Sequence, residues 1–202
     1  MERMIHLFLV GGFVMWPLLL ASVVVIAIAI ERSVFYRRSK SDLALLRDNL
    51  GSLLKRRAWN ETKILLDKVG GSVSDVLGDA VSQREFVTDM SEYLSGTCSQ
   101  TADRLKAQLN YLSAIVTLAP LMGLLGTVIG MIRSFDVLSV SEGEPFAITG
   151  GVAEALVATG FGLFVAILAL IVHVWLSQWA NRCIADVETG ANLFLTGLPA
   201  KE

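Results

Sequence analysis

The sequence predicts an all-α membrane protein with three transmembrane helices and long helical cytoplasmic extensions. Of its 202 residues, 53% are apolar, and its mean hydropathy of +0.59 is too high for an ordinary soluble domain. Three uncharged segments exceed the roughly 17–25 residues that a membrane-spanning helix needs. The uncharged segments are residues 4–30, 107–132 and 155–181, and they predict transmembrane helices at residues 4–30, 107–133 and 149–181. No internal repeat or strand-like alternation argues for another class.

The first apolar segment has one alternative interpretation, a cleaved signal peptide. Its apolar stretch is about twice as long as the apolar region of a signal peptide, and the start "MERM" lacks a cationic region. A retained transmembrane helix is therefore the better prediction.

Basic residues set the expected orientation. Arg32, Arg37, Arg38 and Lys40 follow the first segment, and Arg104 and Lys106 precede the second. Positively charged segments stay in the cytoplasm, which places residues 31–106 and 182–202 inside. The loop at 134–148 and the N-terminus then lie outside, in the periplasm of a Gram-negative cell. The net charge of −2 and the absence of basic clusters interleaved with aromatics give no sign of nucleic-acid binding.

The cytoplasmic part is expected to be helical. "SDLALLRDNLGSLLKRR" has helical apolar spacing. Asn60 is a candidate N-cap for "ETKILLDKV", which Gly70 and Gly71 should end. Heptad-like spacing without a turn signal predicts one long helix over residues 84–134. A second apolar stripe predicts that the third membrane helix continues to about residue 195: Leu176, Ala180, Cys183, Val187, Ala191 and Phe194.

Small residues recur on faces of the second and third membrane helices. The candidate packing positions are Gly123, Gly126, Gly130, Ala155, Gly162 and Ala166. In lipid, small residues let helix backbones approach closely, because no hydrophobic force drives helices together there. These faces fit either packing inside one subunit or a ring of subunits around something narrow.

Glu154 is the residue that packing alone does not explain. An ionised group in a spanning helix costs roughly 2.5–3.5 kcal/mol on insertion scales, so such groups face protein or water. A carboxylate beside a water-filled passage could attract and hand on cations. The alternative is structural: near the start of its helix, Glu154 could interact with the helix N-terminus.

Thr159 and Thr127 are the other candidate ion-pathway residues, since each hydroxyl donates and accepts a hydrogen bond. A structural interpretation stands beside this one, because threonine in a spanning helix often bonds the carbonyl four residues earlier. Glu154 and Thr159 are about 140° apart on one helix, at 100° per residue. They cannot share one narrow stripe, although they could line two sides of a gap between subunits.

The remaining reactive residues suggest no chemistry. Cys98 and Cys183 have no partner spacing and are expected to be free thiols, and His173 is expected to be a neutral, hydrogen-bonded side chain. Pro120 is expected to kink the second membrane helix. The chain has no nucleophile–base pair, no phosphate-binding glycine loop and no metal-ligand cluster. We expect no enzymatic activity, no metal and no cofactor.

Two segments resemble the signature spans of the ExbB/TolQ/MotA family of proton-channel subunits: "LAPLMGLLGTVIGMIRSF" at 118–135 and "GGVAEALVATGFGLFVAI" at 150–167. "GGFVMWPLLLASVVVIAIAIER" at 11–32 also resembles the first span of the ExbB branch. The resemblance covers all three spans in order. Leu168 stands where many relatives have proline, and His173 stands where they usually have another residue.

The resemblance implies a pentameric ring in the bacterial inner membrane around the single spanning helices of an ExbD- or TolR-like partner. Proton flow would then drive work at the outer membrane through a TonB- or TolA-like protein. By resemblance, Glu154 matches the motif glutamate, and Thr159 and Thr127 match two threonines that face the partner's proton-carrying aspartate. TonB-type and Tol-type pathways both fit, as do protons and sodium ions. The rival from another class is a non-conducting membrane scaffold that organises partner proteins.

Overall fold

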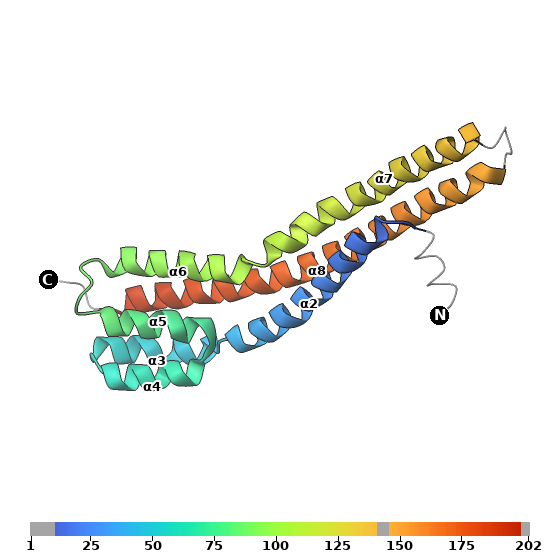
Figure 1. Cartoon of the computed structure of the whole chain (residues 1–202). Helices are drawn as coiled ribbons and strands as arrows, with labels where there is room; N and C mark the ends of the chain where they lie inside the picture. The colour runs from blue at the N-terminus through green and yellow to red at the C-terminus, as the bar shows by residue number, and fades with distance from the viewer. Residues whose placement is uncertain (1–10, 141–145, 199–202) are drawn as a thin grey trace. The chain divides into compact units, whose positions relative to one another are not determined.

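The computed structural model describes residues 11–140 and 146–198, without the side chains of residues 137–140 and 146–148. Within these residues the structure consists of helices and turns, with no strand. The helices are α2 (Met15–Ser39), α3 (Leu43–Lys55), α4 (Trp59–Val69), α5 (Gly71–Gln83), α6 (Met90–Lys106), α7 (Leu109–Val140) and α8 (Phe146–Gly197) (Figure 1). The chain divides into two compact units, residues 1–30 with 109–175 (unit 1) and residues 31–108 with 176–202 (unit 2).

Three helices are long and apolar enough to cross a membrane. They are α2, α7 and α8. The predicted all-helical class with three apolar spans is thereby confirmed. The first helix begins at Met15, and the part of the predicted span at residues 4–10 lies outside the described residues.

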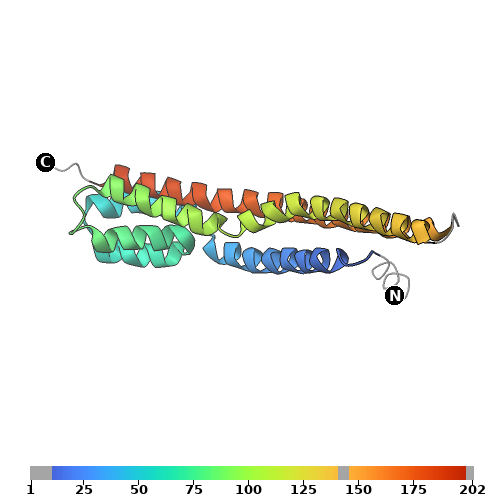
Figure 2. The ribbon, with the colours of Figure 1, turned by 45° about the horizontal axis from the view of Figure 1, so that its top comes forward.

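Unit 1 is held together by a close contact between α7 and the first half of α8, which lie side by side (Figures 1 and 2). A Cβ atom added to Gly162 would lie 2.7 Å from the carbonyl oxygen of Ala119, and one added to Gly123 would lie 3.1 Å from Cα of Thr159. The backbones can come this close only because side chains are missing at these positions. We call this contact the glycine seam. It comprises Ala119, Gly123, Gly126, Gly130 and Ser134 of α7 and Gly151, Ala155, Ala158 and Gly162 of α8.

The glycine seam decides between the two interpretations of the small residues. Five of the six predicted packing residues belong to it, and Ala166 is buried against Val14, Leu18 and Ala119. These residues therefore serve packing inside one chain. A ring of subunits would need other surfaces for its contacts.

Unit 2 packs the helices α3 to α6 with the second half of α8. Its core contains leucines and valines of α3, α4 and α5, together with Leu94, Val187, Ala191 and Phe194. The prediction that the third membrane helix continues to about residue 195 is confirmed, because α8 ends at Gly197 and its predicted stripe is buried.

The long helix predicted over residues 84–134 is wrong. Residues 84–89 form a turn region, α6 begins at Met90 after the N-cap Asp89, and a break at Ala107 and Gln108 separates α6 from α7. The break has a physical reason in α2. Arg32 donates to the carbonyl of Arg104 at 3.3 Å, and the Tyr36 hydroxyl donates to the carbonyl of Leu105 at 2.7 Å. Side-chain donors thus satisfy the last carbonyls of α6 in place of a continued helix.

The predicted N-cap at Asn60 is also wrong. Helix α4 begins at Trp59, its N-cap is Ala58 without a side-chain cap, and Asn60 is exposed in the first turn. The predicted end is confirmed, since α4 stops at Val69 before Gly70, whose φ is +63°. Glycine takes this left-handed conformation without the steric cost of a side chain.

Candidate functional site

Glu154 lies in the third turn of α8, because that helix begins at Phe146. The interaction of a carboxylate with a helix N-terminus fades after the first turn. The capping role considered for Glu154 is therefore wrong, and the reason is that the helix extends further toward the N-terminus than the uncharged segment suggested.

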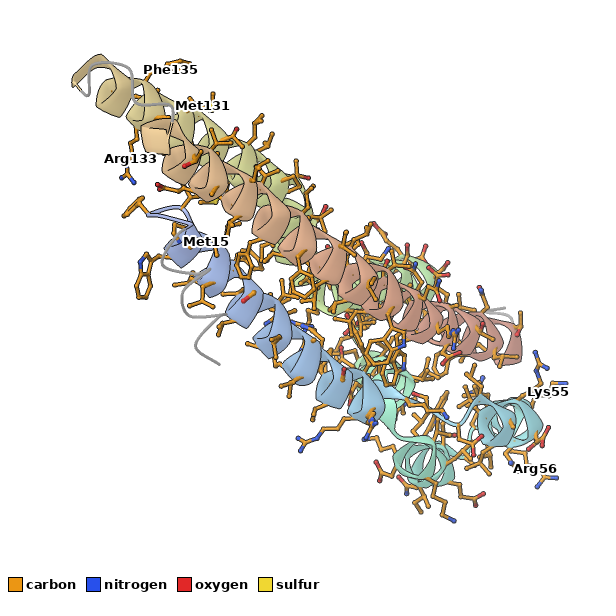
Figure 3. The ribbon with its side chains drawn as sticks, turned by 90° about the vertical axis from the view of Figure 1, so that its right-hand side faces the viewer. Met15, Lys55, Arg56, Met131, Arg133 and Phe135 are labelled. Carbon is orange, nitrogen blue, oxygen red and sulfur yellow. The ribbon has the colours of Figure 1, made fainter. Side chains whose placement is uncertain are left out.

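Arg133 of α7 pairs with Glu154. Its Nη1 atom donates to Oε1 of Glu154 at 2.8 Å, and the exposed fractions of the two side chains are 55% and 19%. Arg133 leaves the C-terminal half of α7 on the side where α2 begins near Met15 (Figure 3). A charge in a spanning helix is tolerated when it is paired in this way. Since the arginine is more exposed than the glutamate, it can move away without unpacking the helices.

Gly12, before the start of α2, leaves space for the carboxylate of Glu154. A Cβ atom added to Gly12 would collide with Oε1 of Glu154, and the φ of Gly12 is +69°. Both facts require glycine at this position. The site of Glu154 is therefore built from the segment before α2, the C-terminal half of α7 and the third turn of α8.

The two threonines lie at the glycine seam. The hydroxyl of Thr159 donates to the carbonyl of Gly123 at 3.0 Å, across the two helices, which differs from the bond within its own helix that is common for threonine. The hydroxyl of Thr127 donates to the carbonyl of Leu124 at 2.6 Å in its own helix. Gly123 has no side chain to cover its carbonyl, so Thr159 can reach it. Thr127 lies one turn further along α7 from Gly123, and both threonines are half-buried.

Glu154 and Thr159 occupy opposite sides of the glycine seam. On the α8 helix their directions are about 140° apart, and the seam residues Ala155, Ala158 and Gly162 lie between them. Among the described residues, no contact joins Glu154 to either threonine. A single chain therefore contains two separate groups of candidate residues. Glu154 contacts Arg133 and lies against Gly12, whereas Thr159 contacts Gly123, one turn from Thr127.

Sequence reasoning missed Arg133 and Gly12 as parts of the site. Arg133 is the first charge after the second apolar segment. Gly12 stands in a Gly-Gly pair before the first span. A charge at the end of one span and an acid near the start of the next are a signal for pairing, because a short connection between two helices makes them neighbours.

Other reactive groups lie apart from this site. Burial raises the pKa of the Cys98 and Cys183 thiols, which makes both poor nucleophiles. Nδ1 of His173 is buried without a hydrogen-bond partner among the described residues, contrary to the expected satisfied histidine. No group of three or more metal-ligating side chains occurs among the described residues.

Together, the three apolar helices and the Arg133–Glu154 ion pair between two of them define an integral membrane protein with a charged site in its spanning helices. Residues 71–189 match the model of the MotA/TolQ/ExbB proton channel family. The chain belongs to this family, as its signature spans predicted, and it is a multi-pass inner-membrane protein.

Relatives with similar sequences support the assignment. The chain is 34% identical over 179 residues to an ExbB-like biopolymer transport protein of Synechocystis sp., covering 84% of this chain and 69% of the relative. It is 30% identical over 180 residues to ExbB of Salmonella typhimurium, covering 83% and 73%. It is 36% identical over 97 residues to the Tol-Pal system protein TolQ of Pseudomonas aeruginosa, covering 48% and 42%.

Proposed function

We propose that this chain is the ring-forming subunit of a proton-driven motor that couples the proton-motive force to movement of an ExbD- or TolR-like single-span partner. The observation that carries the proposal is the paired acid Glu154 in a spanning helix of a proton-channel family member. The motor would act on the outer membrane through a TonB- or TolA-like protein, in biopolymer transport or envelope maintenance. It carries out no covalent chemistry. Its N-terminus would be periplasmic and its C-terminus cytoplasmic.

The Glu154–Arg133 pair suits a carboxylate that exchanges its counter-ion. Its partner is a long side chain with an exposed fraction of 55%, so the pair can open toward water. An approaching cation can then take the place of the guanidinium without leaving the carboxylate unpaired in the membrane, which would be costly. Gly12, which precedes α2, has no side chain that would occupy the space beside the carboxylate.

The two threonines suit a different step of the same path. Both hydroxyls lie at one side of the glycine seam, and a hydroxyl can accept a hydrogen bond while it donates to a carbonyl. They can therefore hold water or an acid supplied by a partner helix. This division of labour requires more than one chain, because Glu154 lies on the other side of the seam. We propose a homo-oligomeric ring, a pentamer by family resemblance.

The test replaces Glu154 by Gln, which keeps its volume and hydrogen bonding and removes its charge. We expect loss of growth that depends on the proton-motive force, while the ring and its partner still co-purify. Glu188→Gln makes the same chemical change at an exposed position of the same helix and should leave growth intact. Thr159→Val and Thr127→Val should impair growth at nearly constant volume and unchanged assembly.

The rival function is a scaffold in which Glu154 and Arg133 form only a structural ion pair. A scaffold needs the pair for stability, so Glu154→Gln should lower thermal stability and leave growth intact wherever the ring still assembles. Normal growth of this variant, with normal partner binding, would refute the motor and favour the scaffold.

A further inference from the structure

Three consecutive basic residues, Lys55, Arg56 and Arg57, stand where α3 ends, and we call them the basic turn. All three are exposed, and the side chains of Lys55 and Arg56 extend away from the helices (Figure 3). Among the described residues, none of the three pairs with a carboxylate. The C-terminal end of a helix attracts cations, which gives Lys55 and Arg56 a local explanation. Arg57 needs a further reason, because its backbone conformation is unfavourable.

Arg57 takes the left-handed conformation, with φ at +53°, and among the described residues it is the only one besides glycine that does so. The N–H of Ala58 donates to the carbonyl of Leu53 at 3.0 Å, and the N–H of Arg57 donates to the carbonyl of Leu54 at 3.0 Å. These two bonds form the helix-ending motif in which glycine usually takes the place of Arg57, because a side chain there is sterically costly. An arginine at a strained position favours a role for its side chain outside the turn.

A groove of about 670 Å³ runs along α6, beside α5 and the turn region that joins them, and we call it the acidic groove. Its lining includes the exposed carboxylates of Asp79, Asp89 and Glu92, and it contains no lysine or arginine. None of these carboxylates pairs with a basic group in the part of the chain that the structure describes. Asp89 caps α6 and Glu92 lies in its first turn, whereas Asp79 lies in the third turn of α5, where no helix end explains it. At Gly96 the groove is open, since an added Cβ would have no heavy atom within 4 Å.

Phe86 lies next to the acidic groove, because it directly precedes the lining residue Val87. Its side chain is 83% exposed, although unit 2 offers it an apolar core. Exposed aromatic side chains often anchor protein interfaces. The face of an aromatic ring also attracts a guanidinium group, and carboxylates bind the same group through two parallel hydrogen bonds. The acidic groove with Phe86 therefore fits arginine side chains better than it fits a compact cation.

The basic turn and the acidic groove lie at the same end of unit 2. The guanidinium carbon of Arg84 lies 5.0 Å from the centre of the Trp59 ring, so the turn region before α6 contacts the start of α4, which follows the basic turn. The helices pack in succession, α3 with α4, α4 with α5 and α5 with α6, which separates the two surfaces by two helices. Two different surfaces at one level can join each copy to a neighbour on either side. Such a head-to-tail contact closes into a ring when the rotation between copies allows it.

We propose that the acidic groove of one copy binds the basic turn of a second copy. This inference rests on the homo-oligomeric ring of the proposed function, and it names a surface that joins neighbouring subunits. The guanidinium groups of Arg56 and Arg57 are of opposite charge to the carboxylates of Asp79 and Glu92, and one of them stacks on Phe86. Each copy gives its basic turn to one neighbour and its acidic groove to the other. The glycine seam is buried inside one chain and cannot supply this contact.

The test cross-links two differently tagged copies in a Cys98→Ala, Cys183→Ala background. One copy carries Arg56→Cys and the other carries Glu92→Cys, and both are expressed with the one-span partner. A short bismaleimide is added to inverted membrane vesicles. We expect a dimer that carries both tags, no dimer from either variant alone, and a ladder of larger products when one chain carries both cysteines. Asp75→Cys, at an exposed acid of α5 outside the groove lining, is the matched control for Glu92→Cys.

The control pair should give at least about tenfold less dimer, because only thiols held side by side react at a high effective concentration. Absence of the doubly tagged dimer would overturn the inference, as would a dimer from one variant alone. Cross-linking of Arg56→Cys to the one-span partner in place of a second copy would also overturn it, since the basic turn would then have another occupant.

Charge exchange provides a second test that needs no cysteine in the contact. Glu92→Arg should lower the fraction of chains in rings at least about fivefold in mild detergent, because like charges then meet. Adding Arg56→Glu to the same chain should restore the rings, since every contact regains opposite charges. Asp75→Arg is the control and should leave the rings intact. Loss of rings without rescue by Arg56→Glu would contradict the contact.

Arg57→Gly separates a role in assembly from a role in the turn. Glycine removes the backbone strain, so the variant should be more stable to heat than the parent chain. It should still give about threefold less of the doubly tagged dimer, because it lacks one of the pairing guanidinium groups. An unchanged yield of dimer would show that the arginine has no part in the contact.

The outcomes separate this inference from the proposed function. Loss of growth in Glu154→Gln, with rings present and no doubly tagged dimer, refutes the contact and leaves the motor standing. The doubly tagged dimer together with normal growth of Glu154→Gln supports the contact and refutes the motor.

Discussion

Adding one methyl group to the glycine seam should separate α7 from α8. In Gly126→Ala, the new Cβ would lie 2.5 Å from Cβ of Ala158, whereas ordinary van der Waals contact begins at 3.4 Å. Neither atom can rotate away, since each is fixed to its helix backbone. The helices must therefore move apart by about 1 Å, and the overpacking should cost about 1–3 kcal/mol.

Gly160→Ala is the matched control for this variant. Gly160 lies on the exposed side of α8, and an added Cβ would have no heavy atom within 4 Å. Both substitutions replace glycine by alanine inside a helix, so the gain of about 1 kcal/mol in helix propensity is common to both. The difference between the two variants isolates the cost of overpacking.

Ala158→Gly supplies a rescue. Without the Cβ of Ala158, the nearest atoms to the new methyl group would be those of Val14 at 3.8 Å, an ordinary contact. A double-mutant cycle of Gly126→Ala and Ala158→Gly should therefore give a coupling free energy of about 1–3 kcal/mol. The free energy of unfolding is measured by denaturant titration of helicity in mild detergent. Equal stability of Gly126→Ala and Gly160→Ala, or no rescue by Ala158→Gly, would refute the seam.

Three further predictions follow from single contacts. Arg133→Gln should impair growth dependent on the proton-motive force less than Glu154→Gln does, because a cation can still replace the guanidinium; equal loss would show that the pair acts as one unit. Tyr36→Phe leaves the carbonyl of Leu105 without its donor, so unit 2 should lose about 1–3 kcal/mol of stability and exchange amide hydrogens faster near Gln108, whereas the exposed Tyr111→Phe should change neither. Burial raises the pKa of Asp186 above its usual value of 3.8 in the folded protein. The folded state therefore holds this proton more tightly than the unfolded state, and the free energy of unfolding falls as the pH rises from 3.8 through the folded-state pKa. Asp186→Asn should therefore stabilise the protein at pH 7, and an equal gain below pH 3.8 would contradict this reasoning.

The class of the protein could be read from the sequence because it depends on composition along the chain. Long uncharged segments form helices in a membrane, where each backbone group must find its partner within the helix. The extension of α8 beyond the membrane segment was also predictable from the sequence, because its apolar stripe continues at helical spacing through Phe194. The signature spans around Thr127 and Glu154 gave the family for the same reason: they are local patterns.

The tertiary structure decided which groups meet. The break between α6 and α7 carries no Gly or Pro signal, because it depends on donors from Arg32 and Tyr36, which lie about seventy residues away in the chain. The small residues fitted two kinds of interface until the glycine seam placed them inside one chain. Glu154 does not cap a helix, because α8 begins at Phe146, and its carboxylate pairs with Arg133 of α7. Periodicity fixes the face of a helix on which a residue lies, but only the packing of helices against one another decides what that face meets.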